Sequence, residues 1–170
     1  MKQAFSSSLK SAALGLLGFS VGLGCLKAGT VLAQAWPNWD GEPLYGEIYL
    51  QSGFTPDPYS VEVWAGGSTN ASSLGLGGDC TGFIAAEQPD FRLQYEAGSY
   101  PLSFLVESAA DTTLVINGPD TGWYCNDDFN GVNPLVYLQR PSSGQYDIWI
   151  GNYGDTSTHE AILYITEYEP

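Results

Sequence analysis

Residues 111–120 read Asp-Thr-Thr-Leu-Val-Ile-Asn-Gly-Pro-Asp, and residues 123–134 continue Trp-Tyr-Cys-Asn-Asp-Asp-Phe-Asn-Gly-Val-Asn-Pro. The first stretch is rich in β-branched residues, which favour extended backbone. The second stretch is dense in Asp and Asn and carries a cysteine at its edge. Together they predict a short strand that leads into an acidic loop.

The same kind of short, alternating run recurs along the chain. Apolar and polar residues alternate with a period of two, turn formers separate the runs, and no helical stripe interrupts them. The predicted strands are 59–65, 91–95, 102–107, 114–117, 135–139, 146–150 and 161–168, with a first strand within 42–53. About eight or nine such strands predict an all-β fold, an antiparallel β-sandwich of the jelly-roll kind. The Gly- and Ser-rich segment 65–78 lacks the pattern and is predicted to be an exposed loop.

The N-terminus has the order of charge, apolar core and small residues that marks an export signal. Lys2 and Lys10 precede an apolar run over 12–26, and Val-Leu-Ala-Gln-Ala follows at 31–35. This pattern predicts a secretory signal peptide over 1–35.

Cleavage after Ala35 would leave one domain, residues 36–170, secreted outside the cell or into the periplasm and not inserted in the membrane. Two alternatives stay open. A membrane anchor is disfavoured by Lys27 and by the Gly and Ser content of the run. A lipid anchor on Cys25 is disfavoured because Leu23 lies one position away from where a lipobox has it.

The charge balance is strongly acidic. The chain has 5 Lys and Arg against 19 Asp and Glu, a formal net charge of −14. Removing the signal would leave Arg92 and Arg140 as the basic residues. That field repels phosphates and anionic lipids, so nucleic acid and membrane surfaces are excluded as partners, and divalent cations are the natural counter-charge.

Cysteine usage agrees with export. Of the 3 cysteines, Cys25 belongs to the predicted signal, and Cys80 and Cys125 remain. An even count in an oxidising compartment predicts a disulfide between them. The alternative, two thiol metal ligands, lacks a CxxC spacing or a nearby histidine.

The acidic loop opens like a calcium loop. Asn126, Asp128 and Asn130 place oxygen-bearing side chains at the first, third and fifth positions, and Gly131 follows at the sixth. The twelfth position is Tyr137, which excludes a complete helix-flanked site, so calcium would draw ligands from elsewhere in the sandwich. The predicted ligand set is Asp111, Asp120, Asn126, Asp127, Asp128 and Asn130. The alternative is a polar turn in which Asn and Asp bind their own backbone.

Catalytic residues are not indicated. His159, the sole histidine, falls in a loop, no serine lies in a nucleophile elbow, and no pair of carboxylates is set apart. The aromatic content is high, with 5 tryptophans and 11 tyrosines. Trp64 and Trp149 fall opposite the apolar residues of their strands and are predicted to form an exposed platform for protein or carbohydrate. Burial of both faces of these strands is the alternative.

Several motifs resemble the bacterial pre-peptidase C-terminal (PPC) domain family, and more closely small exported proteins of that kind that carry an early cysteine like Cys80. The motifs are 53–59, 111–115, 117–120, 123–128, 133–135 and 143–151. The resemblance covers most of 46–168. It implies a PPC-like β-sandwich accessory domain, usually attached to secreted peptidases and serving secretion, stability or substrate contact, with calcium in some relatives. A peptidase label would be inherited from such neighbours.

The sequence thus predicts a secreted, calcium-stabilised β-sandwich that acts as a non-catalytic binding or adhesion module. Its partners would be an extracellular protein, a carbohydrate, or copies of itself. The alternative is a self-assembling structural subunit of an extracellular fibre or matrix, with contacts bridged by calcium. A peptidase or glycosidase ranks third.

Overall fold

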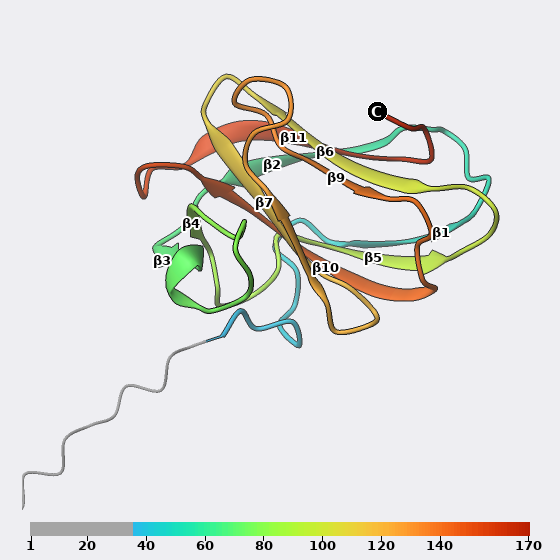
Figure 1. Ribbon diagram of the computed structural model, residues 1–170, viewed down its shortest axis with the longest axis horizontal. Helices are drawn as coiled ribbons and strands as arrows, with labels where there is room; N and C mark the ends of the chain where they lie inside the picture. Colours follow the sequence, from blue (N-terminus) through green and yellow to red (C-terminus); the bar gives the residue numbers. More distant parts are fainter. Residues whose placement is uncertain (1–35) are drawn as a thin grey trace, which may run out of the picture. The chain divides into compact units, whose positions relative to one another are not determined.

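The computed structural model describes residues 36–170, and the predicted signal peptide lies outside the described residues (Figure 1). Two packed β-sheets form the fold, so the predicted all-β sandwich is confirmed. No helix in the described part of the chain is long and apolar enough to cross a membrane. The elements are β1 Glu47–Gln51, β2 Tyr59–Ala65, β3 Thr69–Asn70, the 3-10 helix η1 Ala71–Ser73, β4 Phe83–Ile84, β5 Phe91–Glu96, β6 Leu102–Ser108, β7 Thr112–Asn117, β8 Trp123–Asn126, β9 Leu135–Leu138, β10 Gly144–Asn152 and β11 His159–Thr166.

The larger sheet, sheet A, is built around the long strand β10. One side of β10 pairs with β5 and the short β4, and the other pairs with β7, which continues to β8. At the edge, β1 runs parallel to β5, a departure from the predicted all-antiparallel pairing. The smaller sheet, sheet B, has the order β2-β11-β6-β9 and is antiparallel throughout.

The main core lies between the two sheets and follows the period of two. In β11, Ala161, Leu163 and Ile165 are buried there, while Ile162 and Tyr164 alternate with them. Each large apolar side chain removed from water in this way contributes about 1.5–3 kcal/mol. The alternation seen in the sequence therefore reports the inner face of each strand.

The outer face of sheet A is covered by a second, smaller core. Trp149 and Val115 point outward from the sheet and are buried under Ala71 and Leu74. The prediction of an exposed loop at 65–78 is therefore wrong for these covering residues. Small residues allow the close approach, and a side-chain carbon on Gly67 would lie 2.0 Å from the Ile84 carbonyl carbon.

A second stretch of outer face on sheet A is closed by the segment before β1. The Nε atom of Arg92 donates to the Oδ1 atom of Asp147 at 2.6 Å. The Nη2 atom of Arg92 donates to the carbonyl oxygens of Trp39, at 2.5 Å, and Gly41, at 2.9 Å. The two arginines of residues 36–170 thus differ in their environments. Arg92 is buried in sheet A, and Arg140 is exposed.

Candidate functional site

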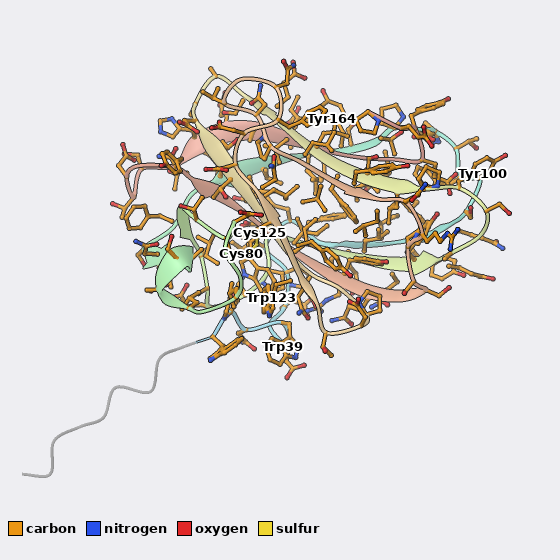
Figure 2. All side chains as sticks on the ribbon, in the orientation of Figure 1. Trp39, Cys80, Tyr100, Trp123, Cys125 and Tyr164 are labelled. Carbon is orange, nitrogen blue, oxygen red and sulfur yellow. A yellow bond between two sulfur atoms is a disulfide. The ribbon has the colours of Figure 1, made fainter. Side chains whose placement is uncertain are left out.

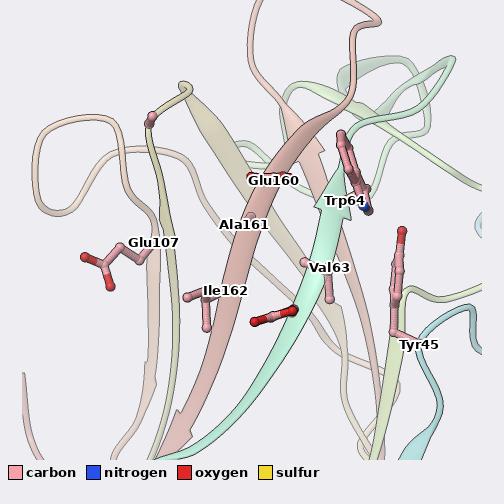
Figure 3. A pocket seen from close by; sticks show the side chains of 9 residues that line it. Tyr45, Val63, Trp64, Glu107, Glu160, Ala161 and Ile162 are labelled. Carbon is pink, nitrogen blue, oxygen red and sulfur yellow. The ribbon is translucent and has the colours of Figure 1, made fainter.

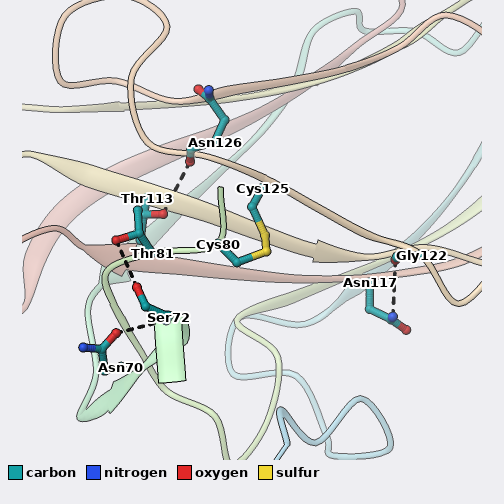
Figure 4. Close-up of a disulfide and its surroundings, with 9 residues drawn as sticks. All are labelled: Asn70, Ser72, Cys80, Thr81, Thr113, Asn117, Gly122, Cys125 and Asn126. Atoms are coloured by element: carbon teal, nitrogen blue, oxygen red, sulfur yellow. Dashed lines mark hydrogen bonds between the residues drawn. A yellow bond between two sulfur atoms is a disulfide. The ribbon is translucent and has the colours of Figure 1, made fainter. Parts of the chain in front are cut away.

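The disulfide joins the segment that covers sheet A, which contains Ala71, Leu74 and Cys80, to strand β8 of that sheet. Cys80 and Cys125 form a disulfide bond (Figure 4). Cys125 lies on β8 and faces Val115 on the neighbouring strand β7. The predicted pairing is present in the structure. It holds the cover against the second core.

Strand β8 lies inside the stretch that the sequence analysis treated as a loop. It pairs with β7 so that Asn117 faces Trp123 and Leu114 faces Asn126. The alternation of Trp123 and Cys125 with Tyr124, after a Gly-Pro-Asp turn, is the signal that could have found it. Because β7 and β8 form a hairpin, the predicted calcium ligands are distributed to its two ends.

Asp120 lies at the turn of this hairpin, and both oxygens of its carboxylate accept hydrogen bonds from neighbouring residues. Its Oδ1 atom accepts from the Gly122 backbone N–H at 3.0 Å, and its Oδ2 atom accepts from the Tyr124 hydroxyl at 2.6 Å. The Tyr124 hydrogen bond, followed by that of Gly122, lowers the pKa of Asp120. The six residues of β7 separate it from Asp111, roughly 20 Å at ~3.3 Å per residue. Asp120 therefore cannot share an ion with Asp111.

The acidic residues at the open end of the hairpin lie close enough to influence one another. The pKa of Asp111 is raised, first by burial and then by the charges of Asp128 and Asp127. The Oδ1 atom of Asp111 is buried without a hydrogen-bond partner. Even so, no three His, Cys, Asp or Glu side chains within residues 36–170 are grouped as a metal-binding cluster.

The two asparagines of the predicted ligand set serve the backbone. The Oδ1 atom of Asn126 accepts from the Leu135 N–H at 2.9 Å. Asn130 forms a tight bridge with Asn133, its N–H donating at 3.1 Å. The polar-turn alternative thus accounts for the side chains of Asp120 and Asn126, and the side chains that could hold calcium reduce to those of Asp111, Asp127, Asp128 and Asn130.

The two tryptophans of the predicted platform have opposite environments. Trp149 is 0% exposed and packs in the second core, with its ring 5.7 Å from that of Trp123. The Trp123 ring lies 6.4 Å from the ring of Trp39 (Figure 2), so Trp123 lies between the exposed Trp39 and the buried Trp149. Trp149 therefore cannot belong to an exposed platform. Trp64 is 51% exposed and lies on the outer face of sheet B.

A hollow of about 670 Å³ lies beside Trp64 on sheet B (Figure 3). Strand register arranges its floor: Glu160 on β11 faces Trp64 on β2, and Ile162 on β11 lies between Glu62 on β2 and Glu107 on β6. All three glutamates are exposed. The three glutamates come from three adjacent strands and line the same hollow.

Two further hollows continue across the same outer face. One of about 230 Å³ is lined by Tyr164, Leu105 and Tyr168. Another of about 360 Å³ shares Tyr164 and Leu105 and adds Phe129. The Tyr164 hydroxyl donates to the Oε2 atom of Glu107 at 3.2 Å and so connects these hollows to the first. We call the outer surface of β2, β11, β6 and β9 the open face.

Two buried acids were not anticipated from the sequence. Asp90 is 1% exposed, and its Oδ2 atom accepts from the Ile150 N–H at 2.7 Å. Burial raises the pKa of Asp90 to about 8. Glu167 accepts from the Tyr95 hydroxyl at 2.6 Å and from the Gly53 N–H at 2.7 Å. Both acids accept hydrogen bonds from the backbone, and neither lines a hollow of the open face.

No protein-family model and no curated protein matches this sequence. The resemblance to the PPC family therefore stays a prediction. Among solved structures, the fold is similar to that of Aeromonas hydrophila PliG, a periplasmic lysozyme inhibitor of g-type lysozyme. The two share 12% sequence identity over 71% of this chain and 96% of that chain, with a TM-score of 0.35. A likeness at this level assigns neither a function nor a partner.

Proposed function

We propose that residues 36–170 are an exported, non-catalytic binding module that contacts its partner through the open face of sheet B. The observation that carries this proposal is the difference between the two outer faces. The centre of sheet A is covered by a second core and by the segment before β1, while Tyr49 on the edge strand β1 is exposed. Sheet B carries an uncovered surface with three hollows.

The exposed aromatic side chains of the open face favour binding to a partner molecule. Trp64, Tyr168 and Phe129 are all more than half exposed, at 51%, 67% and 56%. Rigid aromatic side chains that remain in water on an uncovered surface are characteristic of contact sites for proteins and carbohydrates. Catalysis instead depends on a site that excludes water around the reacting groups, and these hollows are open to solvent along the sheet.

Export is supported by the signal-like N-terminus and by the Cys80–Cys125 disulfide, since disulfides persist in oxidising compartments. An extracellular or periplasmic location is also where an acidic, non-membrane binding module would meet other secreted molecules. Its partner would be an extracellular protein or a carbohydrate.

A binding assay with immobilised protein tests the assignment of the open face as the contact surface. The exported protein, a Trp64→Ala/Ile162→Asp variant and a Tyr100→Ala control are immobilised and exposed to extracellular protein and to insoluble cell-wall polysaccharide. Tyr100 is a suitable control because it is 56% exposed and precedes β6 outside the open face. We expect the wild type and the control to retain the same bound component and the face variant to lose it. Equal retention by all three proteins would remove the open face from the proposal.

Calcium is a second element of the proposed function. We propose that the ion binds at the open end of the β7–β8 hairpin. There the Oδ1 atom of Asp111 is buried without a hydrogen-bond partner, and the charges of Asp128 and Asp127 contribute to the raised pKa of Asp111. Calcium accepts carboxylate, amide and backbone carbonyl oxygens together, so a small carboxylate set can be completed by the loop backbone and water. Its role would be to stabilise the loop, at a distance from partner binding.

A further inference from the structure

We propose that the partner of the open face is a protein segment that presents arginine or lysine, with one cationic head seated in the hollow beside Trp64. This inference rests on the proposed function and specifies the chemistry of its partner. It is carried by the placement of three carboxylates, by one exposed indole, and by the absence of a neighbouring Lys or Arg among residues 36–170.

The carboxylates surround a single apolar residue. Glu62 and Glu107 flank Ile162 on its two sides, and Glu160 lies two residues before it on the same strand. Adjacent strands lie about 4.8 Å apart, so each carboxylate is within reach of a cation placed over Ile162. Like charges at this spacing repel one another, and a bound cation would relieve that repulsion.

The described residues offer these acids no Lys or Arg partner, and the basic side chain nearest in sequence is the imidazole of His159, next to Glu160. Lys and Arg within residues 36–170 are limited to Arg92 and Arg140. Arg92 is held in the ion pair with Asp147 on the opposite sheet. Arg140 is exposed in the turn between β9 and β10, on the far side of sheet B from β2. Within residues 36–170, neither arginine supplies a counter-charge to the hollow, which favours a cation brought by another molecule.

The indole adds a preference for an organic cation. Trp64 is half exposed and directly faces Glu160 across the β2–β11 pair, and Figure 3 shows Trp64 and Tyr45 along the same border of the hollow. A guanidinium can stack on an indole while its N–H groups reach a carboxylate. The apolar Ile162 floor accommodates the aliphatic stem of the same side chain.

Other occupants fit less well. A second copy of this chain would bring the same acidic face and repel it. A bare metal ion needs carboxylates gathered around one point, whereas these three glutamates lie on three different strands. A neutral sugar would use the indole but would leave three charges without a partner.

A titration followed by NMR tests the inference on isotope-labelled protein, expressed as the full chain and purified after export. The probes are an end-blocked arginine–glycine repeat peptide, its lysine and glutamate counterparts, and cellohexaose. The inference predicts that the arginine peptide shifts amides of β2, β11 and β6, that the lysine peptide does so more weakly, and that added salt weakens both. The glutamate peptide should leave these amides unchanged.

Variants separate this hollow from the overall acidity of the protein. The Glu62→Gln/Glu160→Gln variant should bind the arginine peptide with an affinity about three- to tenfold lower. Glu47→Gln/Glu87→Gln removes the same charge from exposed positions elsewhere and should change it less than about twofold. Trp64→Leu, which keeps an apolar side chain, should weaken it about two- to fivefold. All of these side chains are exposed, and unchanged melting temperatures would show that the variants are folded.

The outcomes distinguish the two proposals. Equal weakening by the two double variants, or shifts scattered over both sheets, would overturn the cationic-partner inference by showing non-specific charge attraction. If cellohexaose shifts the β2, β11 and β6 amides and the arginine peptide does not, the open face remains a binding surface and the cationic partner is rejected.

Discussion

Arg92 and Asp147 face each other across the β5–β10 pair, and the Arg92 Nε and Asp147 Oδ1 atoms lie 2.6 Å apart. The guanidinium also holds two carbonyl oxygens of the segment that would follow the signal peptide. One residue thus connects the segment before β1 to the central strand of sheet A.

Replacing Arg92 with Met should lower the free energy of unfolding by about 3–5 kcal/mol, because a buried charge loses its partner. Arg140→Met is the matched control, since it removes the same charge from an exposed turn, and it should change stability by less than about 0.5 kcal/mol. Urea unfolding of both variants measures the difference. Similar unfolding midpoints would show that the ion pair does not stabilise the fold.

Asp90 should make stability fall as the pH rises. Its folded pKa of about 8 lies above the unfolded value of ~3.9, so between these values the folded protein binds the extra proton. Unfolding then becomes easier with each step from about pH 4 to about pH 8. Asp90→Asn keeps an acceptor for the Ile150 N–H and removes this dependence. Thermal melts should show the variant gaining stability over the wild type as the pH rises through this window, and parallel curves would contradict the assignment.

Removing the disulfide should loosen the cover of sheet A. Cys80 and Cys125 are 45 residues apart, and closing a loop of that length stabilises a fold by about 4 kcal/mol in the chain-entropy model. A Cys80→Ser/Cys125→Ser variant should lose about this much and should shift tryptophan emission to longer wavelength as water reaches Trp149. Unchanged emission would mean that the second core holds without the covalent bond.

The two predicted platform tryptophans should respond in opposite ways to truncation. Trp149→Ala empties the second core and should cost about 3–5 kcal/mol. Trp64→Ala removes a half-exposed ring and should change stability by less than about 0.5 kcal/mol. Chemical denaturation of the pair provides the comparison, and a large cost at Trp64 would show that the open face is part of the stabilising core.

Calcium should raise the melting temperature of the oxidised protein. At a hundred times its dissociation constant a ligand adds about 2.7 kcal/mol. Asp111→Asn should abolish this rise, whereas Asp120→Asn should preserve it because Asp120 is bonded at the other end of the hairpin. The rise should also weaken on acidification, since the pKa of Asp111 is raised and its protonated form binds calcium poorly. Loss of the response in Asp120→Asn would restore the larger ligand set.

The period of two was sufficient to predict the sandwich, because each buried strand face repeats every second residue. It was not sufficient for Trp149, whose outward side chain is buried under Ala71 and Leu74. The covering segment is rich in Gly and Ser, so it carries no hydrophobic period that would announce its contact with the sheet. The ion pair of Arg92 with Asp147 is equally invisible before the register of β5 and β10 is known.

The site illustrates a similar limit. A local count of acids placed Asp120 and Asp128 in one calcium loop, and strand β8 separates them because it pairs along β7. Conversely, Glu62, Glu107 and Glu160 are distant in sequence and meet only through the pairing of β2, β11 and β6. Density in sequence and proximity in space are thus different quantities in a sheet protein.

Under the proposed function, the unequal covering of the two sheets would also set the valency of the molecule. With one face open for contact and the other closed by its own chain, each copy would engage one partner at a time. Such a protein can mask a site on a larger target in a stoichiometry of one to one. Cross-linking two targets, or extending a fibre, would require a second contact surface, and the cover on sheet A reduces the area available for one.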